Sequence, residues 1–108
     1  MWGICLDSSL CEGSIFQRVI EYCLENNNKA IIVQPVSNVE IDIQNIKELT
    51  NSPKYKYGDI VSLVYNMNIK GKIRDIVYHF KSQTFNYYIE VDNRKRNKRH
   101  YETDLIKF

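Results

Sequence analysis

Residues 57–108 decide the fold of this chain. They hold four short apolar stretches, which read YGDIV at 57–61, GKI at 71–73, YYIEV at 87–91 and YETDLI at 101–106. β-Branched and aromatic residues alternate there with polar residues or glycine, which is the pattern of strands with one buried face. The spacing of the stretches predicts a compact β-barrel of five strands.

The second strand of this barrel runs from Ile69 to about Phe80 and changes phase along its length. Its apolar residues lie on one face up to Ile73 and on the other face from Ile76 onward. A β-bulge near Arg74-Asp75 would restore the inward face, and such bulges bend strands around the corners of small barrels. We therefore predict a bulge at this position.

Two tight connections complete the expected barrel. Asp92-Asn93 opens a hairpin loop after a third strand at 85–91, because both residues suit two-residue hairpin turns. A short fourth strand is expected at 101–103, a turn at 104–105 and a closing strand at 106–108.

This order of motifs resembles the Src-homology-3-like small barrels of the tudor, chromo and KOW type. Gly58-Asp59-Ile60-Val61 is similar to the entry into their first strand, and Asp104-Leu105-Ile106 resembles the short helical turn before their fifth strand. The resemblance covers about half of the chain. It implies binding of methylated lysine or arginine in an aromatic cage, or binding of RNA and of the ribosomal or transcription machinery.

Six aromatic residues are candidates for the walls of such a cage. They are Tyr55, Tyr57, Tyr78, Phe80, Phe85 and Tyr88. A barrel this small fills its interior with residues of the same type, so packing in the core or at its rim is the stronger interpretation.

The first 53 residues predict a unit of strand, helix and strand. Strands are expected at 2–6 and at 30–34, the second ended by Pro35. Residues 14–25 predict a helix between them, since apolar side chains recur at the spacing of one helical face. These are Ile15, Phe16, Val19, Ile20, Cys23 and Leu24. On this face Cys23 would act as a small hydrophobic residue.

Residues 39–49 fit two structures. Val39, Ile41 and Ile43 alternate as in a strand, whereas Asp42 could cap a short helix that continues through Leu49. We expect a strand followed by a short helix.

Asn51-Ser52-Pro53 marks the expected domain boundary. The predicted fold class is therefore α+β, with a small unit at 1–53 and a five-stranded Src-homology-3-like barrel at 54–108. The first unit carries three basic and seven acidic residues, a net charge of −4, and the second carries 12 basic and 6 acidic residues, a net charge of +6. A charge-polarised surface of this kind steers charged partners, or it lets the two units attract each other.

The most prominent surface candidate is the basic run from Arg94 to His100. Its side chains can neutralise phosphates or pair with acidic groups, and neighbouring tyrosines can stack on bases. The residues predicted to bind a partner, either protein or nucleic acid, are Arg94, Lys95, Arg96, Lys98, Arg99, His100, Tyr88 and Tyr101.

Two classes of function follow from this surface. In the first, the chain is a non-enzymatic protein-binding module, such as a stoichiometric inhibitor, an immunity-type protein or an adaptor, whose partner presents an acidic surface. In the alternative, the basic hairpin 94–100 binds RNA or DNA. A homodimer is a further alternative, because the apolar stripe of the predicted helix needs a cover.

Catalysis has little support in the sequence. His79 and His100 have no carboxylate or nucleophile at a recognisable spacing, and the glycines are isolated. Cys5, Cys11 and Cys23 fit neither a disulfide framework nor a zinc motif. We expect no catalytic residue, no metal, no cofactor and no membrane span. We further expect a cytoplasmic location and, from the Asn, Ile and Lys content, a bacterial or phage origin.

Overall fold

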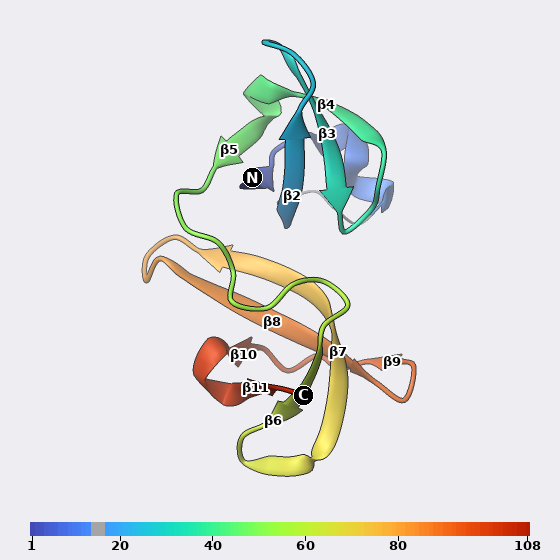
Figure 1. Ribbon diagram of the computed structural model, residues 1–108, viewed down its shortest axis with the longest axis vertical. Helices are drawn as coiled ribbons and strands as arrows, with labels where there is room; N and C mark the ends of the chain where they lie inside the picture. Colours follow the sequence, from blue (N-terminus) through green and yellow to red (C-terminus); the bar gives the residue numbers. More distant parts are fainter. Residues whose placement is uncertain (14–16) are drawn as a thin grey trace. The chain divides into compact units, whose positions relative to one another are not determined.

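The computed structural model describes residues 1–13 and 17–108, with only the backbone described at 11–13. The chain forms two compact units, Met1–Ser52 and Pro53–Phe108 (Figure 1). Each unit is built on one antiparallel sheet, and each is described below by itself.

The N-terminal unit contains a five-stranded sheet in the order β4-β3-β2-β1-β5. Two 3-10 helices, η1 at Ser8–Gly13 and η2 at Ile43–Asn45, join its strands. The strands are β1 at Trp2–Cys5, β2 at Val19–Leu24, β3 at Lys29–Gln34, β4 at Val39–Asp42 and β5 at Ile46–Glu48. β3 and β4 lie where strands were expected. The helix expected to continue through Leu49 is wrong: only the 3-10 turn η2 forms at Ile43–Asn45, Asp42 makes no side-chain cap, and Ile46–Glu48 form β5.

The predicted helix at 14–25 is wrong. Residues 14–16 lie outside the described part of the chain, and Val19–Leu24 form β2, which pairs with both β1 and β3. Ile20 and Tyr22 alternate with Glu21 and point into the core, whereas Cys23 and Leu24 are exposed. The β-branched and aromatic residues at 19–22 favour a strand, and only as a strand can this segment satisfy the backbone of β1.

The core of the N-terminal unit is small and draws on four of its strands. Its buried residues are Cys5, Ile20, Tyr22, Ala30, Ile32 and Ile41. Leu10, Val39, Ile43 and Ile46 pack against them. Cys5 is thus a core residue and Cys23 a surface residue, the reverse of what the helical pattern indicated for Cys23.

The C-terminal unit contains a six-stranded sheet in the order β10-β8-β7-β6-β11, with β9 paired to β8. The 3-10 helix η3 at Glu102–Asp104 connects β10 to β11. The strands are β6 at Ile60–Leu63, β7 at Asn66–His79, β8 at Thr84–Val91, β9 at Arg94–Lys95, β10 at His100–Tyr101 and β11 at Leu105–Lys107.

The expected closed barrel is also wrong. β10 and β11 are the two edges of this sheet, and no ladder joins them within residues 53–108. β10 is only two residues long, and the residues that follow it form η3 instead of extending the strand. The fold class is therefore not α+β: two open antiparallel sheets make up the structure, without an α-helix in the described residues.

Two local predictions in this unit are confirmed. The register of β7 against β8 shifts between Ile73 and Asp75, which places the bulge at Arg74. Asp92 and Asn93 have φ angles of 53° and 63°, and they join Val91 to Arg94 in a two-residue hairpin. Both features re-aim side chains of β7 and β8, and they determine where the basic run begins.

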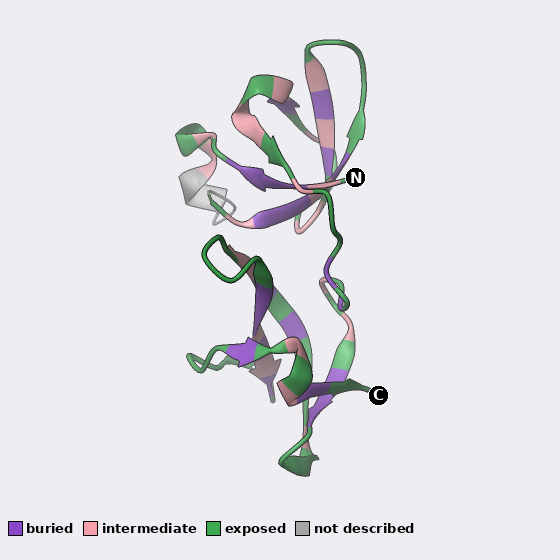
Figure 2. Ribbon diagram, turned by 90° about the vertical axis from the view of Figure 1, so that its left-hand side faces the viewer, coloured by how far each residue is buried: buried purple, intermediate pink, exposed green. Residues whose placement is uncertain are grey.

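The core of the C-terminal unit consists of residues that alternate along its strands (Figure 2). The buried hydrophobic residues are Tyr55, Val61, Leu63, Ile73, Ile76, Phe85, Tyr87, Ile89, Val91 and Leu105. The Tyr55 and Tyr87 rings meet edge to face, with centroids 5.5 Å apart. The Tyr55 hydroxyl donates to the carbonyl oxygen of Leu105 over 2.9 Å and so ties the start of the unit to β11.

The two units share one strand order. When β9, which pairs only with β8, is left out of the count, both sheets run fourth, third, second, first, fifth strand, and in both a 3-10 helix leads into the last strand. Equivalent backbone hydrogen bonds flank the first strands: Leu6 to Asn45 and Leu49 to Trp2 in one unit, Val64 to Asp104 and Phe108 to Ile60 in the other. The chain is therefore a tandem of two small β-units of equal topology.

The same cross-strand pair contains a glycine in both units, on the first strand of one unit and on the second strand of the other. Gly3 on the first strand faces Ile20, and in the second unit Gly71 faces Val61 from the neighbouring strand. A Cβ atom on Gly3 would lie 2.6 Å from Ile46 Cγ2, and one on Gly71 would lie 3.0 Å from Ile89 Cδ1. Each glycine allows a third strand or side chain to approach closely.

Candidate functional site

The basic run lies on the hairpin of β8 and β9 and on the loop that leads into β10. Arg94 and Lys95 pair with Val91 and Glu90 across the hairpin, and the N–H of Arg96 donates to the carbonyl oxygen of Ile89 over 2.9 Å. The backbone of this hairpin is therefore fixed to the sheet, and the long basic side chains extend from an ordered support.

His100 does not share the exposed surface of the run. His100 lies on β10, pairs with Tyr87 of β8 and is only 2% exposed. Burial lowers the pKa of its imidazole, with Lys98 adding to that effect and Asp104 opposing it. His100 is thus a neutral core side chain at neutral pH.

Lys95 forms an ion pair with a buried carboxylate. Its Nζ lies 2.8 Å from Oδ2 of Asp75, whose side chain is 5% exposed. A charge-assisted contact to a buried carboxylate is stronger than an ordinary surface pair. Lys95 therefore supports the fold by holding β9 to the bulged part of β7, and it is less available to a partner than its sequence position suggests.

Lys98 and Arg99 each lie over a tyrosine ring. Lys98 Nζ is 4.7 Å from the ring centre of Tyr65 and 3.3 Å from its hydroxyl oxygen, and Arg99 Cζ is 5.8 Å from the ring centre of Tyr101. Tyr65 is 59% exposed and Tyr101 49% exposed. Two cations that are adjacent in sequence thus each contact an exposed tyrosine ring.

The role of Tyr65 was missed from the sequence. β6 ends at Leu63, and Tyr65 lies in the turn that follows, where its ring is exposed. Asn66, Met67 and Asn68, which follow this turn, already belong to β7. Tyr88, which was predicted, is half-buried opposite Asp75 on β7.

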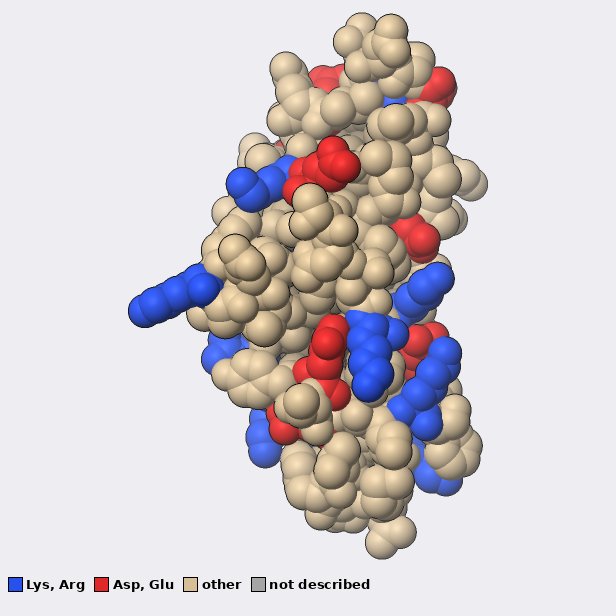
Figure 3. All heavy atoms as spheres, turned by 60° about the vertical axis from the view of Figure 1, so that its left-hand side comes forward, with Lys and Arg blue, Asp and Glu red and all other residues tan. Residues whose placement is uncertain are grey.

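Arg94 and Arg96 are the other two exposed cations of the basic run that are considered for binding. Neither side chain has a partner among the described residues. Figure 3 shows Lys and Arg side chains over much of the surface of this unit, with fewer Asp and Glu between them. Arg94, Arg96, Lys98 and Arg99, together with the rings of Tyr65 and Tyr101, form what we call the basic-aromatic strip.

A hollow of about 280 Å³ opens beside the strip on the C-terminal unit. Its lining residues come from the β7–β8 hairpin and from the segment around β10. They are His79, Ser82, Thr84, Asn86, Arg99 and Tyr101. Asn86 is only 1% exposed, and its side-chain oxygen has no hydrogen-bond partner in the described structure.

Three side chains on the rim of this hollow are linked by hydrogen bonds. Ser82 Oγ lies 2.7 Å from His79 Nδ1 and 2.7 Å from Thr84 Oγ1. The Ser82 N–H donates to the same His79 Nδ1 over 3.3 Å, so this nitrogen acts as an acceptor. The proton of the neutral ring then resides on Nε2, which is a hydrogen-bond donor.

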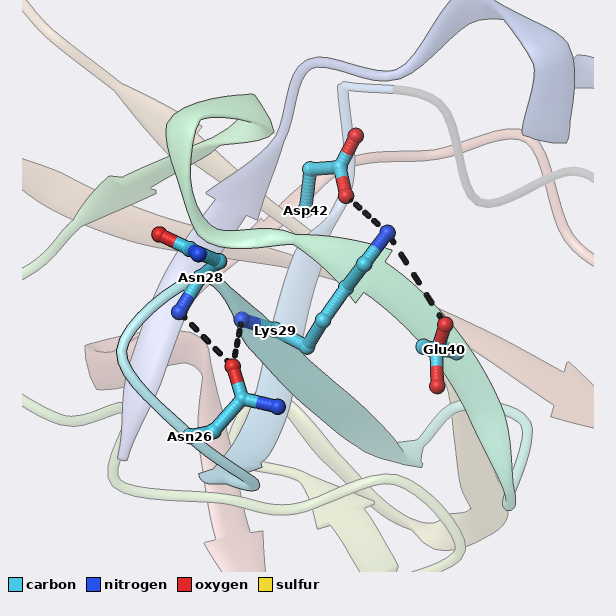
Figure 4. A network of polar contacts seen from close by, with 5 residues as sticks. All are labelled: Asn26, Asn28, Lys29, Glu40 and Asp42. Carbon is cyan, nitrogen blue, oxygen red and sulfur yellow. Dashed lines mark hydrogen bonds and ion pairs between the residues drawn. The ribbon is translucent and has the colours of Figure 1, made fainter.

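The N-terminal unit carries a polar network of a different kind (Figure 4). Lys29 Nζ binds the carboxylate of Asp42, its cross-strand partner, and lies 3.8 Å from Glu40. The side-chain oxygen of Asn26 accepts the N–H groups of Asn28 and Lys29. This network closes the β2–β3 turn and joins β3 to β4, and it raises the pKa of Lys29 through the bond to Asp42. Its groups are used within the fold.

The aromatic residues named as candidates for a cage do not form one in the described structure. Tyr78 packs edge to face on Phe80 and on Phe85, and Tyr55 and Phe85 are buried, so the aromatic residues serve packing and do not surround an open cage. Residues 1–10 and 17–108 hold no group of three or more His, Cys, Asp or Glu side chains that could bind a metal. In the same residues, no helix has the length and apolar character needed to cross a bilayer.

Comparison with known proteins identifies the family of this chain. No curated protein matches it. A family model matches residues 13–106, which include most of both β-units. The chain therefore belongs to DUF6960, a family of unknown function.

Proposed function

We propose that the C-terminal unit binds single-stranded nucleic acid through the basic-aromatic strip. The carrying observation is that Lys98 and Arg99, adjacent in sequence, each lie over an exposed tyrosine ring, Tyr65 and Tyr101. Proteins that bind single strands use this combination, in which rings stack on bases and cations follow the phosphates.

The charge of the unit supports the same proposal. The C-terminal unit has a net charge of +6, and Arg94 and Arg96 extend the strip with two cations that have no partner in the described structure. Each phosphate neutralised on a single strand contributes about −0.7 to the slope of log affinity against log salt concentration. Four cations therefore correspond to a slope of roughly −3.

Fluorescence anisotropy with 12-nucleotide single-stranded RNA and DNA, across a salt series from low to physiological concentration, tests the proposal. The double variant Lys98→Ser/Arg99→Ser should bind more weakly and reduce the salt slope by about 1.4, two phosphates at about 0.7 each. Tyr65→Ala and Tyr101→Ala should each weaken binding by about 1–3 kcal/mol. The matched control is Lys54→Ser/Lys56→Ser, which removes the same charge from the same unit outside the strip.

If the strip variant and the control lose the same amount of affinity, binding depends only on the net charge of the unit. That result would contradict a defined binding site. If no single strand or duplex binds at low salt, the nucleic-acid proposal is wrong. The cations of the strip would then be assigned to an acidic protein surface, the other class of partner expected from the sequence.

A further inference from the structure

The hollow beside the basic-aromatic strip contains a buried polar group that the fold does not use. Asn86 lies on β8 between Val77 of β7 and Tyr101 of β10, and it is 1% exposed. Its side-chain oxygen has no hydrogen-bond partner among the described residues. Buried polar side chains are nearly always paired, so an unpaired amide oxygen on the wall of a hollow indicates a missing ligand.

The other lining residues define the chemistry of that ligand. Arg99 is a cation without an acidic partner in the described structure, and the Tyr101 ring beside it is half-exposed. His79 can donate from Nε2, because its Nδ1 accepts the N–H of Ser82. A ligand with a flat ring, an anionic group and an edge of hydrogen-bonding atoms would use all of these groups.

The size of the hollow limits the ligand to one nucleotide. A volume of about 280 Å³ holds roughly nine water molecules at about 30 Å³ each. This is room for one base with its sugar-phosphate at the rim. An asparagine amide can pair with a base edge that presents an amino group next to a ring nitrogen, as adenine does.

We propose that this hollow binds one base of the bound strand, with Tyr101 stacking on the base, Asn86 reading its amino-bearing edge and Arg99 and His79 holding the adjacent phosphate. The inference rests on the proposed nucleic-acid function and adds a base preference to it. Adenine and cytosine, which present an amino group next to an acceptor ring nitrogen, bind in preference to uracil, because the unpaired Asn86 oxygen is an acceptor.

The test compares binding of 12-nucleotide oligo(A), oligo(C) and oligo(U) RNA to the full chain and to Asn86→Val. Valine fits a β-strand and removes the amide. It should lower the affinity for oligo(A) or oligo(C) about tenfold while changing that for oligo(U) little. Asn97→Val, in the exposed basic loop, is the matched control and should leave all three affinities unchanged.

Thermal unfolding of the same variants separates a ligand site from a structural role. Removal of a buried amide whose oxygen is unpaired should leave the melting temperature unchanged or raise it, whereas a structural amide would make Asn86→Val less stable. A lowered melting temperature, or oligomer binding with unchanged base preference in Asn86→Val, overturns the base site alone. Failure of every oligomer to bind overturns both the base site and the nucleic-acid function.

Discussion

The hydroxyl group of Tyr87 donates a hydrogen bond to the carboxylate of Glu102 over 2.8 Å. The same oxygen accepts the backbone N–H of Lys54 over 3.0 Å. Burial is the main reason that the pKa of Tyr87 is raised, and the carboxylate of Glu102 raises it further. One phenol group thus joins β8, η3 and the segment that enters the C-terminal unit.

Tyr87→Phe should lower the free energy of unfolding by about 1–3 kcal/mol, because it removes the acceptor of the buried Tyr55 N–H, which lies 3.4 Å from the Tyr87 oxygen, and a donor to the partly buried carboxylate of Glu102. Urea unfolding followed by circular dichroism measures the change. Tyr88→Phe, which removes a hydroxyl group from the adjacent half-buried ring, is the control and should change stability little. Equal effects of the two variants would show that the Tyr87 network is not a specific support.

Lys95→Met should destabilise the protein more than Arg94→Met, although the two residues are adjacent on β9. Lys95 holds the buried Asp75 carboxylate over 2.8 Å, whereas Arg94 has no side-chain partner in the described structure. Loss of a hydrogen bond to a charged group costs about 1.5–3 kcal/mol. Chemical unfolding of both variants at pH 7 tests the difference, and a larger effect of Arg94→Met would contradict the assigned contact.

Gly3→Ala should be more destabilising than Gly71→Ala. The added methyl group on Gly3 would lie 2.6 Å from Ile46 Cγ2 and 2.9 Å from the carbonyl oxygen of Lys47, and a backbone oxygen cannot move aside easily. Overpacking of this kind costs about 1–3 kcal/mol. The corresponding contacts at Gly71 are 3.0 to 3.1 Å, so Gly71→Ala should stay closer to the wild type. Differential scanning calorimetry should rank the two melting temperatures in this order.

Stability should fall as the pH is lowered below about 6.5, the ordinary pKa of histidine. Burial lowers the pKa of His100 in the folded state. Above the ordinary pKa the ring is neutral in both states, and below it the unfolded state binds the proton first and is favoured. Urea unfolding at pH 7.5, 6.5 and 5.5 should show this loss in the wild type and a smaller loss in His100→Gln.

Local turn chemistry in this chain could be predicted, because it depends on a few adjacent residues. Asp92 and Asn93 tolerate positive φ angles, and they form the expected hairpin. The bulge beside Asp75 was visible as a phase change in the apolar pattern of β7. Both signals involve the backbone preferences of single residues or the two-residue period of a strand.

Longer-range structure could not be predicted for equally physical reasons. Val19, Ile20, Cys23 and Leu24 satisfy a helical period, but β1 and β3 each need a hydrogen-bonding neighbour, and β2 supplies it. The pattern of six residues contains no information about the hydrogen-bonding partners that β1 and β3 need elsewhere in the chain.

Within the candidate site, the charges of the basic run could be predicted but not their use. The burial of His100 and the pairing of Lys95 with Asp75 depend on the register of β8 against β9 and β10. Asn86 carries no sequence signal at all, since only the structure places its amide in a hollow.

The adjacency of first and last strands in both units has a consequence for how the chain folds during synthesis. Gly3 pairs with Glu48, so every strand of the first sheet leaves the ribosome before β6 and β11 do. Because the two units share this strand order, β5 would be a ready competitor for the edge that β6 offers to β11. Completing the first sheet before β6 leaves the ribosome removes that competitor and protects the tandem from strand exchange.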